Sequence, residues 1–137
     1  MNDFFAFLYE TVLSFFRDPF SVDMYRESQY STIGIMTVIV SFFFFFLFYY
    51  IINKPSFSKW KHWVLFLLIN FGFCFLLGYV IPQNFFDSFF QGKIMIPSEV
   101  YFGFAFWNGV LGVLFYIIFS FSLRWWSTNC KGTPFPY

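Results

Sequence analysis

YFGFAFWNGVLGVLFYIIFSFSL is the sequence from Tyr101 to Leu123, and it contains no charged residue. Two further stretches, Ile33–Ile52 and Trp63–Ile81, are also free of charge. About 20 helical residues, each rising about 1.5 Å, cross a hydrocarbon core of about 30 Å. We therefore predict an all-α integral membrane protein with three transmembrane helices, over residues 33–52, 63–81 and 101–123.

The overall composition favours the same fold class. Hydrophobic residues make up 59% of the 137 residues and charged residues 11%, against about 25% charged in a soluble domain. We predict a single membrane domain over residues 1–137. The 28 phenylalanines fill all faces of the predicted helices, which lipid tolerates, so we attribute them to an AT-rich genome rather than to an aromatic ligand surface.

Residues 3–17 have the pattern of a short amphipathic helix. At 100° per residue, one half of the wheel is apolar and the other half carries Asp3, Glu10, Ser14 and Arg17, with Phe7 as the large exception. The element is too short and too polar to span, so we predict an N-terminal helix lying flat in the interface or packed on a protein partner. The apolar half comprises Phe4, Phe5, Leu8, Val12, Leu13, Phe15 and Phe16.

The segments between the spans can be assigned from their composition. Residues 19–32 are predicted to form a polar connector, and Pro82 is predicted to end the second span. Residues 83–96 are too apolar for a free loop, so we predict an outer interfacial segment there. Ser98 is a candidate cap for the third helix, and residues 124–137 are predicted to be an extended cytoplasmic tail.

Charges are distributed unequally between the two sides that three spans would create. Residues 53–62 and 124–137 contain five Lys or Arg and no acid, whereas all seven acids lie in residues 1–32 and 82–100 with Arg17, Arg26 and Lys93. Because basic residues near span ends are retained in the cytoplasm, we predict an N-out, C-in orientation. We expect a bacterial inner membrane, with an organellar inner membrane as the alternative. The five bases are Lys54, Lys59, Lys61, Arg124 and Lys131.

The sequence lacks the residue patterns of enzymes and ion-coupled transporters. Proton relays and voltage sensors use ionisable groups inside the membrane, and none occurs in the three spans. There are no paired carboxylates, Ser/His/Asp set, phosphate loop or metal-ligand spacing, and Cys74 and Cys130 fall at different depths. We predict no enzymatic activity, no catalytic residues, no cofactor and no metal. Nucleic acid and small-molecule substrates are not expected as partners.

The few polar and small residues of the spans are candidates for helix packing. In the third span they share an arc of about 120° at helical spacing. Estimated depths place Asn70 level with Tyr116 and Asn108 level with Thr37, which predicts two hydrogen-bonded pairs within one bundle. The alternative is that each asparagine faces another subunit. The predicted packing and interaction residues are Thr37, Asn70, Ala105, Asn108, Gly109, Gly112 and Tyr116.

Two functions fit this pattern. We predict a non-enzymatic small integral-membrane subunit that packs within a larger membrane protein assembly, with the lipid bilayer and other membrane subunits as its partners. The alternative is a small self-associating pore former, because the length, three spans and N-out, C-in topology resemble those of class I phage holins. A pore would need a polar lining, for which the candidates are Thr37, Ser41, Asn70, Asn108 and Ser120.

Overall fold

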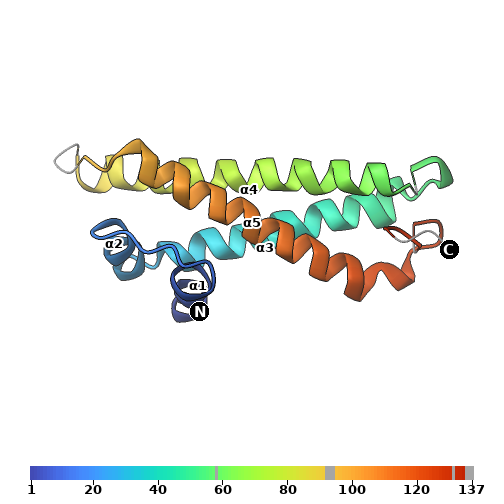
Figure 1. Ribbon diagram of the computed structural model, residues 1–137, viewed down its shortest axis with the longest axis horizontal. Helices are drawn as coiled ribbons and strands as arrows, with labels where there is room; N and C mark the ends of the chain where they lie inside the picture. The colour runs from blue at the N-terminus through green and yellow to red at the C-terminus, as the bar shows by residue number, and fades with distance from the viewer. Residues whose placement is uncertain (58, 92–94, 131, 135–137) are drawn as a thin grey trace.

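The computed structural model describes residues 1–57, 59–91, 95–130 and 132–134, and every regular element within these ranges is a helix (Figure 1). In chain order the elements are α1 (Asn2–Ala6), the π-helical η1 (Phe7–Val12), α2 (Phe20–Arg26), α3 (Gln29–Phe46), the π-helical η2 (Leu47–Ile52), the 3-10 turn η3 (Pro55–Phe57), α4 (Trp60–Phe89), α5 (Ser98–Leu123) and the 3-10 turn η4 (Arg124–Trp126).

Three helical stretches are long and apolar enough to cross a membrane. They run over Gln29–Ile52, Trp60–Phe89 and Ser98–Trp126, with 24, 30 and 29 residues. At about 1.5 Å per residue each exceeds the hydrocarbon core of about 30 Å. Within the described residues, the prediction of an all-α chain with three helices long and apolar enough to span a membrane is confirmed.

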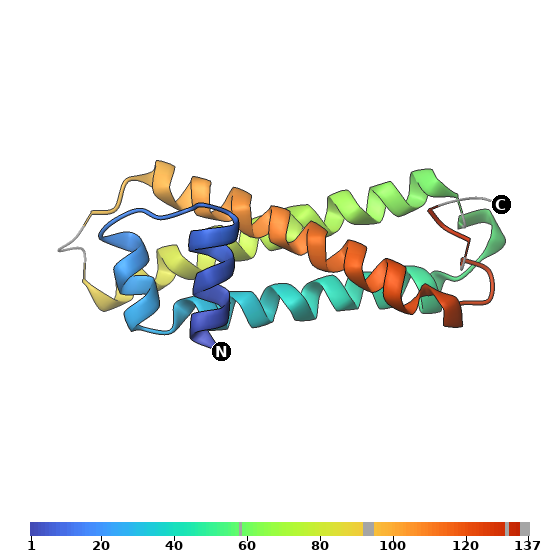
Figure 2. The same ribbon diagram turned by 60° about the horizontal axis from the view of Figure 1, so that its bottom comes forward.

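The three long helices form an elongated bundle in which α3 packs against both α4 and α5 (Figures 1 and 2). Residues 1–28, here called the N-terminal segment, lie toward the same end as the α4–α5 connection. The α3–α4 connection and the C-terminus lie at the other end. The acids in residues 1–28 and 87–99 therefore define an acidic end, and Lys54, Lys59, Lys61 and Arg124 define a basic end.

The prediction that the second span ends at Pro82 is wrong, because helix α4 continues to Phe89. Proline removes one backbone hydrogen bond, a loss that spanning helices tolerate where neighbouring helices support them. That support comes from Phe86, which is 2% exposed and stacks on Phe20 of α2 with ring centroids 5.4 Å apart. The predicted outer segment 83–96 is therefore helical through Phe89, and its residues 92–94 lie outside the described residues.

The N-terminal helix is shorter than the predicted 3–17. Helical structure ends at Val12, and Ser14 has a φ of 53°, in the left-handed region that ends a helix. The predicted apolar half also divides into two. Phe5, Leu13 and Phe15 are buried, while Phe4, Val12 and Phe16 are exposed.

The predicted polar connector 19–32 is largely helical. Phe20 and Met24 are one turn apart in α2 and both are buried, which provides the apolar face that orders this short helix. Helix α3 then begins at Gln29, before the predicted Ile33, because the fully buried Tyr30 belongs to the packed core. Composition alone predicts neither α2 nor the early start of α3, because each depends on only one or two buried side chains.

The described part of the predicted extended tail folds back onto the end of η2, the continuation of α3. Asn53 ends η2, where helix carbonyls lose their intrahelical partners. Ser127 Oγ donates to the Tyr49 carbonyl at 2.8 Å, and Asn129 Nδ2 donates to the Asn53 carbonyl at 2.7 Å. Asn53 Nδ2 donates to Thr128 Oγ1 at 2.8 Å. These bonds attach residues 127–129 to the basic end of the bundle.

Two apolar cores lie along the bundle. The core near the acidic end joins the N-terminal segment to the three helices, and it includes Phe5, Tyr9, Phe20, Tyr30, Phe86, Tyr101 and Phe104. The core near the basic end includes Phe45, Phe48, Tyr49, Phe66, Tyr116 and Cys130.

Candidate functional site: a buried polar layer

Polar side chains from all three long helices meet inside the bundle. Thr37 and Ser41 of α3, Asn70 of α4 and Asn108 of α5 are each 0% exposed. Thr37 and Ser41 are four residues apart, so they share one face of α3. Because a polar group in hydrocarbon is costly unless it is hydrogen-bonded, each side chain requires a partner inside the protein.

Helices α4 and α5 exchange a reciprocal pair of hydrogen bonds. Asn70 Nδ2 of α4 donates to the Gly112 carbonyl of α5 at 2.9 Å, and Asn108 Nδ2 of α5 donates to the Cys74 carbonyl of α4 at 2.6 Å. Each asparagine thus bonds to the residue four positions after the other asparagine. We call Asn70, Cys74, Asn108 and Gly112 the asparagine clasp. It fixes both the register and the close approach of the two helices.

The Asn108 side chain also joins two other elements to the clasp. Its Oδ1 accepts a hydrogen bond from Thr37 Oγ1 of α3 at 2.9 Å and one from the Tyr9 hydroxyl of η1 at 2.5 Å. Thr37 Oγ1 is also 2.8 Å from the Ile33 carbonyl, so its proton is shared between two acceptors. One amide therefore connects α3, α4, α5 and the N-terminal segment.

Ser41 and Cys74 complete the layer on the Asn70 side. Ser41 Oγ donates to the Gly112 carbonyl at 3.1 Å and accepts from Asn70 Nδ2 at 3.4 Å. The Cys74 thiol donates to Asn70 Oδ1 at 3.8 Å, a normal length for sulfur. The Gly112 carbonyl uses both lone pairs, one for an amide and one for a hydroxyl.

Small residues allow the backbones to approach closely enough for these bonds. A Cβ added to Gly112 would lie 2.4 Å from Cys74 Sγ, and one added to Gly78 would lie 2.7 Å from the Asn108 Cβ and 3.0 Å from the Ala105 Cα. At Gly109 the added Cβ would lie 2.7 Å from the ring of Phe71. Side chains from the facing helix therefore occupy the space that these glycines leave.

The predicted packing residues fall into two groups in the structure. Thr37, Asn70, Ala105, Asn108, Gly109 and Gly112 all lie where α3, α4 and α5 meet. The expected Thr37–Asn108 hydrogen bond is present. Whether any of these residues also contacts another subunit stays a prediction.

The expected Asn70–Tyr116 hydrogen bond does not form. Tyr116 is fully buried, but its hydroxyl has no hydrogen-bond partner among the described residues, and its ring centroid lies 5.8 Å from that of Trp63. Asn70 instead donates to the Gly112 carbonyl, which lies one turn before Tyr116 in α5. The missing side chain of Gly112 makes this backbone oxygen accessible, so it competes successfully with the phenol.

Tyr9 is the member of the layer that sequence analysis missed. Phe5, Tyr9 and Leu13 recur every fourth residue and all three are buried, so the four-residue spacing was the available signal. Burial raises the pKa of the Tyr9 phenol, which keeps the hydroxyl protonated as a donor to Asn108. Its ring contacts those of Tyr30 and Phe104, with centroids 5.4 and 4.9 Å away.

The polar groups of this layer hold the helices together. Its hydroxyls and amides donate to one another or to backbone carbonyls, so these groups are already occupied by partners within the chain. Within the described ranges, no group of three or more His, Cys, Asp or Glu residues is placed to hold a metal ion. The layer therefore stabilises one arrangement of the three helices.

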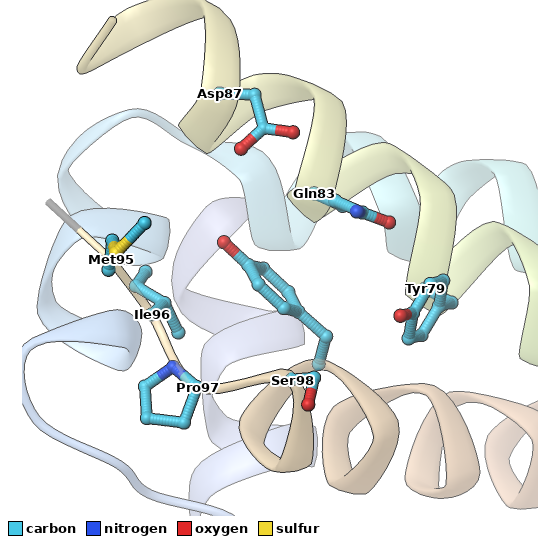
Figure 3. A pocket seen from close by; sticks show the side chains of 8 residues that line it. Tyr79, Gln83, Asp87, Met95, Ile96, Pro97 and Ser98 are labelled. Atoms are coloured by element: carbon cyan, nitrogen blue, oxygen red, sulfur yellow. The ribbon is translucent and has the colours of Figure 1, made fainter. Parts of the chain in front are cut away.

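A second feature is a cleft of about 470 Å³ at the acidic end, between α4, α5 and residues 95–97 (Figure 3). It is lined by Tyr79, Gln83, Asp87, Met95, Ile96, Pro97, Ser98 and Tyr101.

No family model, curated protein or solved structure was found to match this chain.

Proposed function

We propose that this protein is a non-enzymatic small integral-membrane subunit that packs within a larger membrane assembly. The observation that supports this function is the burial of the polar side chains of the spans. Thr37, Ser41, Asn70, Asn108 and Ser120 are each 0% exposed and hydrogen-bonded within a single chain. Side chains used in this way hold helices together, whereas a holin-like pore would turn them toward water.

The outward surface of the bundle also suits a subunit. Only 22% of the apolar central part of α4 is buried within the chain, so much of that helix faces lipid or neighbouring proteins. Three helices alone cannot enclose such surfaces, which the bilayer and other membrane subunits would cover. The exposed apolar residues of α4 include Leu65, Leu68, Ile69, Phe73, Leu76 and Val80.

We further propose that the N-terminal segment lies in the membrane interface. Its exposed residues include Phe4, Phe7 and Phe16, which are more than half exposed and would be costly in water. Its acid Asp3 turns toward α2, where Tyr25 donates to Asp3 Oδ1 at 2.6 Å. Exposed apolar side chains beside a hydrogen-bonded carboxylate suit the headgroup level.

The proposed orientation is N-out and C-in, in a bacterial inner membrane or, as the alternative, an organellar one. The support is the absence of acids from the basic end of the sequence. Ser56 and Ser88 are exposed near opposite ends of the bundle. With single cysteines at these positions in a chain lacking Cys74 and Cys130, an impermeant thiol reagent should label position 88 but not position 56 in intact cells. Labelling of position 56 alone would reverse the orientation.

Function is tested by expressing the chain alone in a host that lacks its partners. A subunit should accumulate in the membrane without dye leakage, because its polar groups are already hydrogen-bonded. Purification from the native source in mild detergent should then recover other membrane chains in fixed ratio, as measured by mass spectrometry. Abrupt leakage caused by the folded chain alone would instead establish the holin-like function.

A further inference from the structure

The cleft at the acidic end combines three kinds of surface. Figure 3 shows Asp87 of α4 facing Met95 and Ile96 across the opening, with Tyr79 and Ser98 on its other side. The ring of Tyr101, a residue only 6% exposed, also lines it. The cleft thus presents a carboxylate, two phenol rings and an apolar edge, and its volume of about 470 Å³ is typical of small-molecule sites.

A second cleft of about 420 Å³ adjoins the first and shares Tyr79 and Ser98 with it. It is lined in addition by Glu99, Phe102 and Gly103, so it continues over the first turns of α5. Together the two clefts form one surface that combines polar and apolar side chains. We call this surface the amphipathic groove.

The charge of the groove favours a ligand with a positively charged group. Among the described residues that line it, Asp87 and Glu99 carry negative charge, and there is no Lys, Arg or His. Carboxylates beside tyrosine rings attract ammonium groups, through ion pairing and through cation–π interaction with the ring faces. An anionic ligand would meet repulsion at both carboxylates.

The position of the groove along the membrane normal indicates which kind of molecule supplies the ammonium group. Asp87 lies two residues before the end of α4 and beyond the apolar stretch that ends at Ile81, so it is at headgroup level. Phe102 lies about one turn into α5, at the edge of the acyl region. A ligand that fills both parts has a cationic head and an apolar tail.

We propose that the amphipathic groove binds a zwitterionic phospholipid, with the ammonium of the head group between Asp87 and the ring of Tyr79, and an acyl chain along Phe102 and Gly103. This lipid site is independent of any partner subunit. It adds a selective lipid contact at the end of the bundle opposite to the basic residues.

The test is a lipid titration of the delipidated full-length protein followed by native mass spectrometry. Phosphatidylethanolamine and phosphatidylglycerol with identical acyl chains differ in the ammonium group. We expect the first phosphatidylethanolamine to bind about fivefold more tightly, from one partly exposed ion pair and a cation–π contact. Asp87→Asn should reduce this preference to about twofold or less, because only the Glu99 carboxylate then remains in the groove. Asp23→Asn is the matched control, because it removes the same charge from α2, outside the groove.

The outcomes separate the alternatives. Asp87 is exposed near a helix C-terminus, where a negative charge is unfavourable, so Asp87→Asn should not lower the thermal unfolding temperature. Equal binding of the two lipids, or equal loss of preference in Asp87→Asn and Asp23→Asn, would overturn the proposal. Soluble glycerophosphoethanolamine, which has no acyl chain, should fail to compete with the lipid. Competition at equal concentration would make the groove a site for soluble amines instead.

Discussion

Replacing Asn108 by leucine should lower the free energy of unfolding by about 2–4 kcal/mol, because one amide holds four elements together. The substitution removes the bond to the Cys74 carbonyl and leaves the Tyr9 hydroxyl without its acceptor. Thr37 keeps the Ile33 carbonyl, so its loss is smaller. Intramembrane hydrogen bonds contribute about 0.6 kcal/mol on average and up to about 1.7 kcal/mol each. Unfolding by a denaturing detergent, followed by circular dichroism, measures the change.

Two further variants identify the cause of that loss. Asn84→Leu makes the same chemical change on an exposed position of α4, and it should alter the stability by less than about 0.5 kcal/mol. Tyr9→Phe should cost about 1 kcal/mol in the native background and less in Asn108→Leu, where the hydroxyl is already unpaired. Additive effects of Tyr9→Phe and Asn108→Leu would show that the two side chains do not interact.

The three spans could be predicted from sequence because their determinant is composition. A charge-free stretch of spanning length, such as Tyr101–Leu123, does not depend on any particular neighbour. The face of α5 that carries Asn108 and Gly112 could also be predicted, because helical spacing alone places residues on a face. Both predictions depend only on the length of an apolar stretch and on helical spacing, and both can be read from the sequence of the segment itself.

The hydrogen-bond partners could be predicted only in part. Equal depth in the membrane predicts which side chains can pair, and this prediction holds for Thr37 and Asn108. Asn70 instead uses a backbone carbonyl, and backbone acceptors are present at every turn of every helix. The choice among them depends on how closely two helices approach, and that distance is set by the packing of Gly112 on Cys74. Sequence spacing does not contain this distance.

The elements at the two ends depend on contacts between distant residues. Pro82 predicted a helix end, yet Phe86 continues α4 because Phe20 stacks on it. The N-terminal segment is similarly positioned by Phe5, whose ring occupies the space above Gly34, where an added Cβ would clash. Local propensity is overridden at both places by side chains far away in the sequence.

Replacing Gly112 by alanine should destabilise the bundle by about 2 kcal/mol or more, as expected for overpacking. The added Cβ would lie 2.4 Å from Cys74 Sγ and 2.8 Å from Cys74 Cβ, so α4 and α5 would have to separate. Separation also lengthens both hydrogen bonds of the asparagine clasp, which begin at 2.9 and 2.6 Å. Alanine is the better helix former by about 0.5–1 kcal/mol, so a net loss would show that packing outweighs propensity.

Gly72→Ala provides the matched control, because a Cβ at Gly72 would meet nothing within 4 Å. This variant should be neutral or more stable by up to about 1 kcal/mol. Cys74→Gly should partly rescue Gly112→Ala, since it removes the two atoms that lie less than 3 Å from the new methyl group. Thermal unfolding of Gly72→Ala, Gly112→Ala and the double variant Gly112→Ala/Cys74→Gly in one detergent provides the comparison. If Gly112→Ala were as stable as Gly72→Ala, or if Cys74→Gly destabilised it further, the close contact between α4 and α5 would not be what holds the polar layer together.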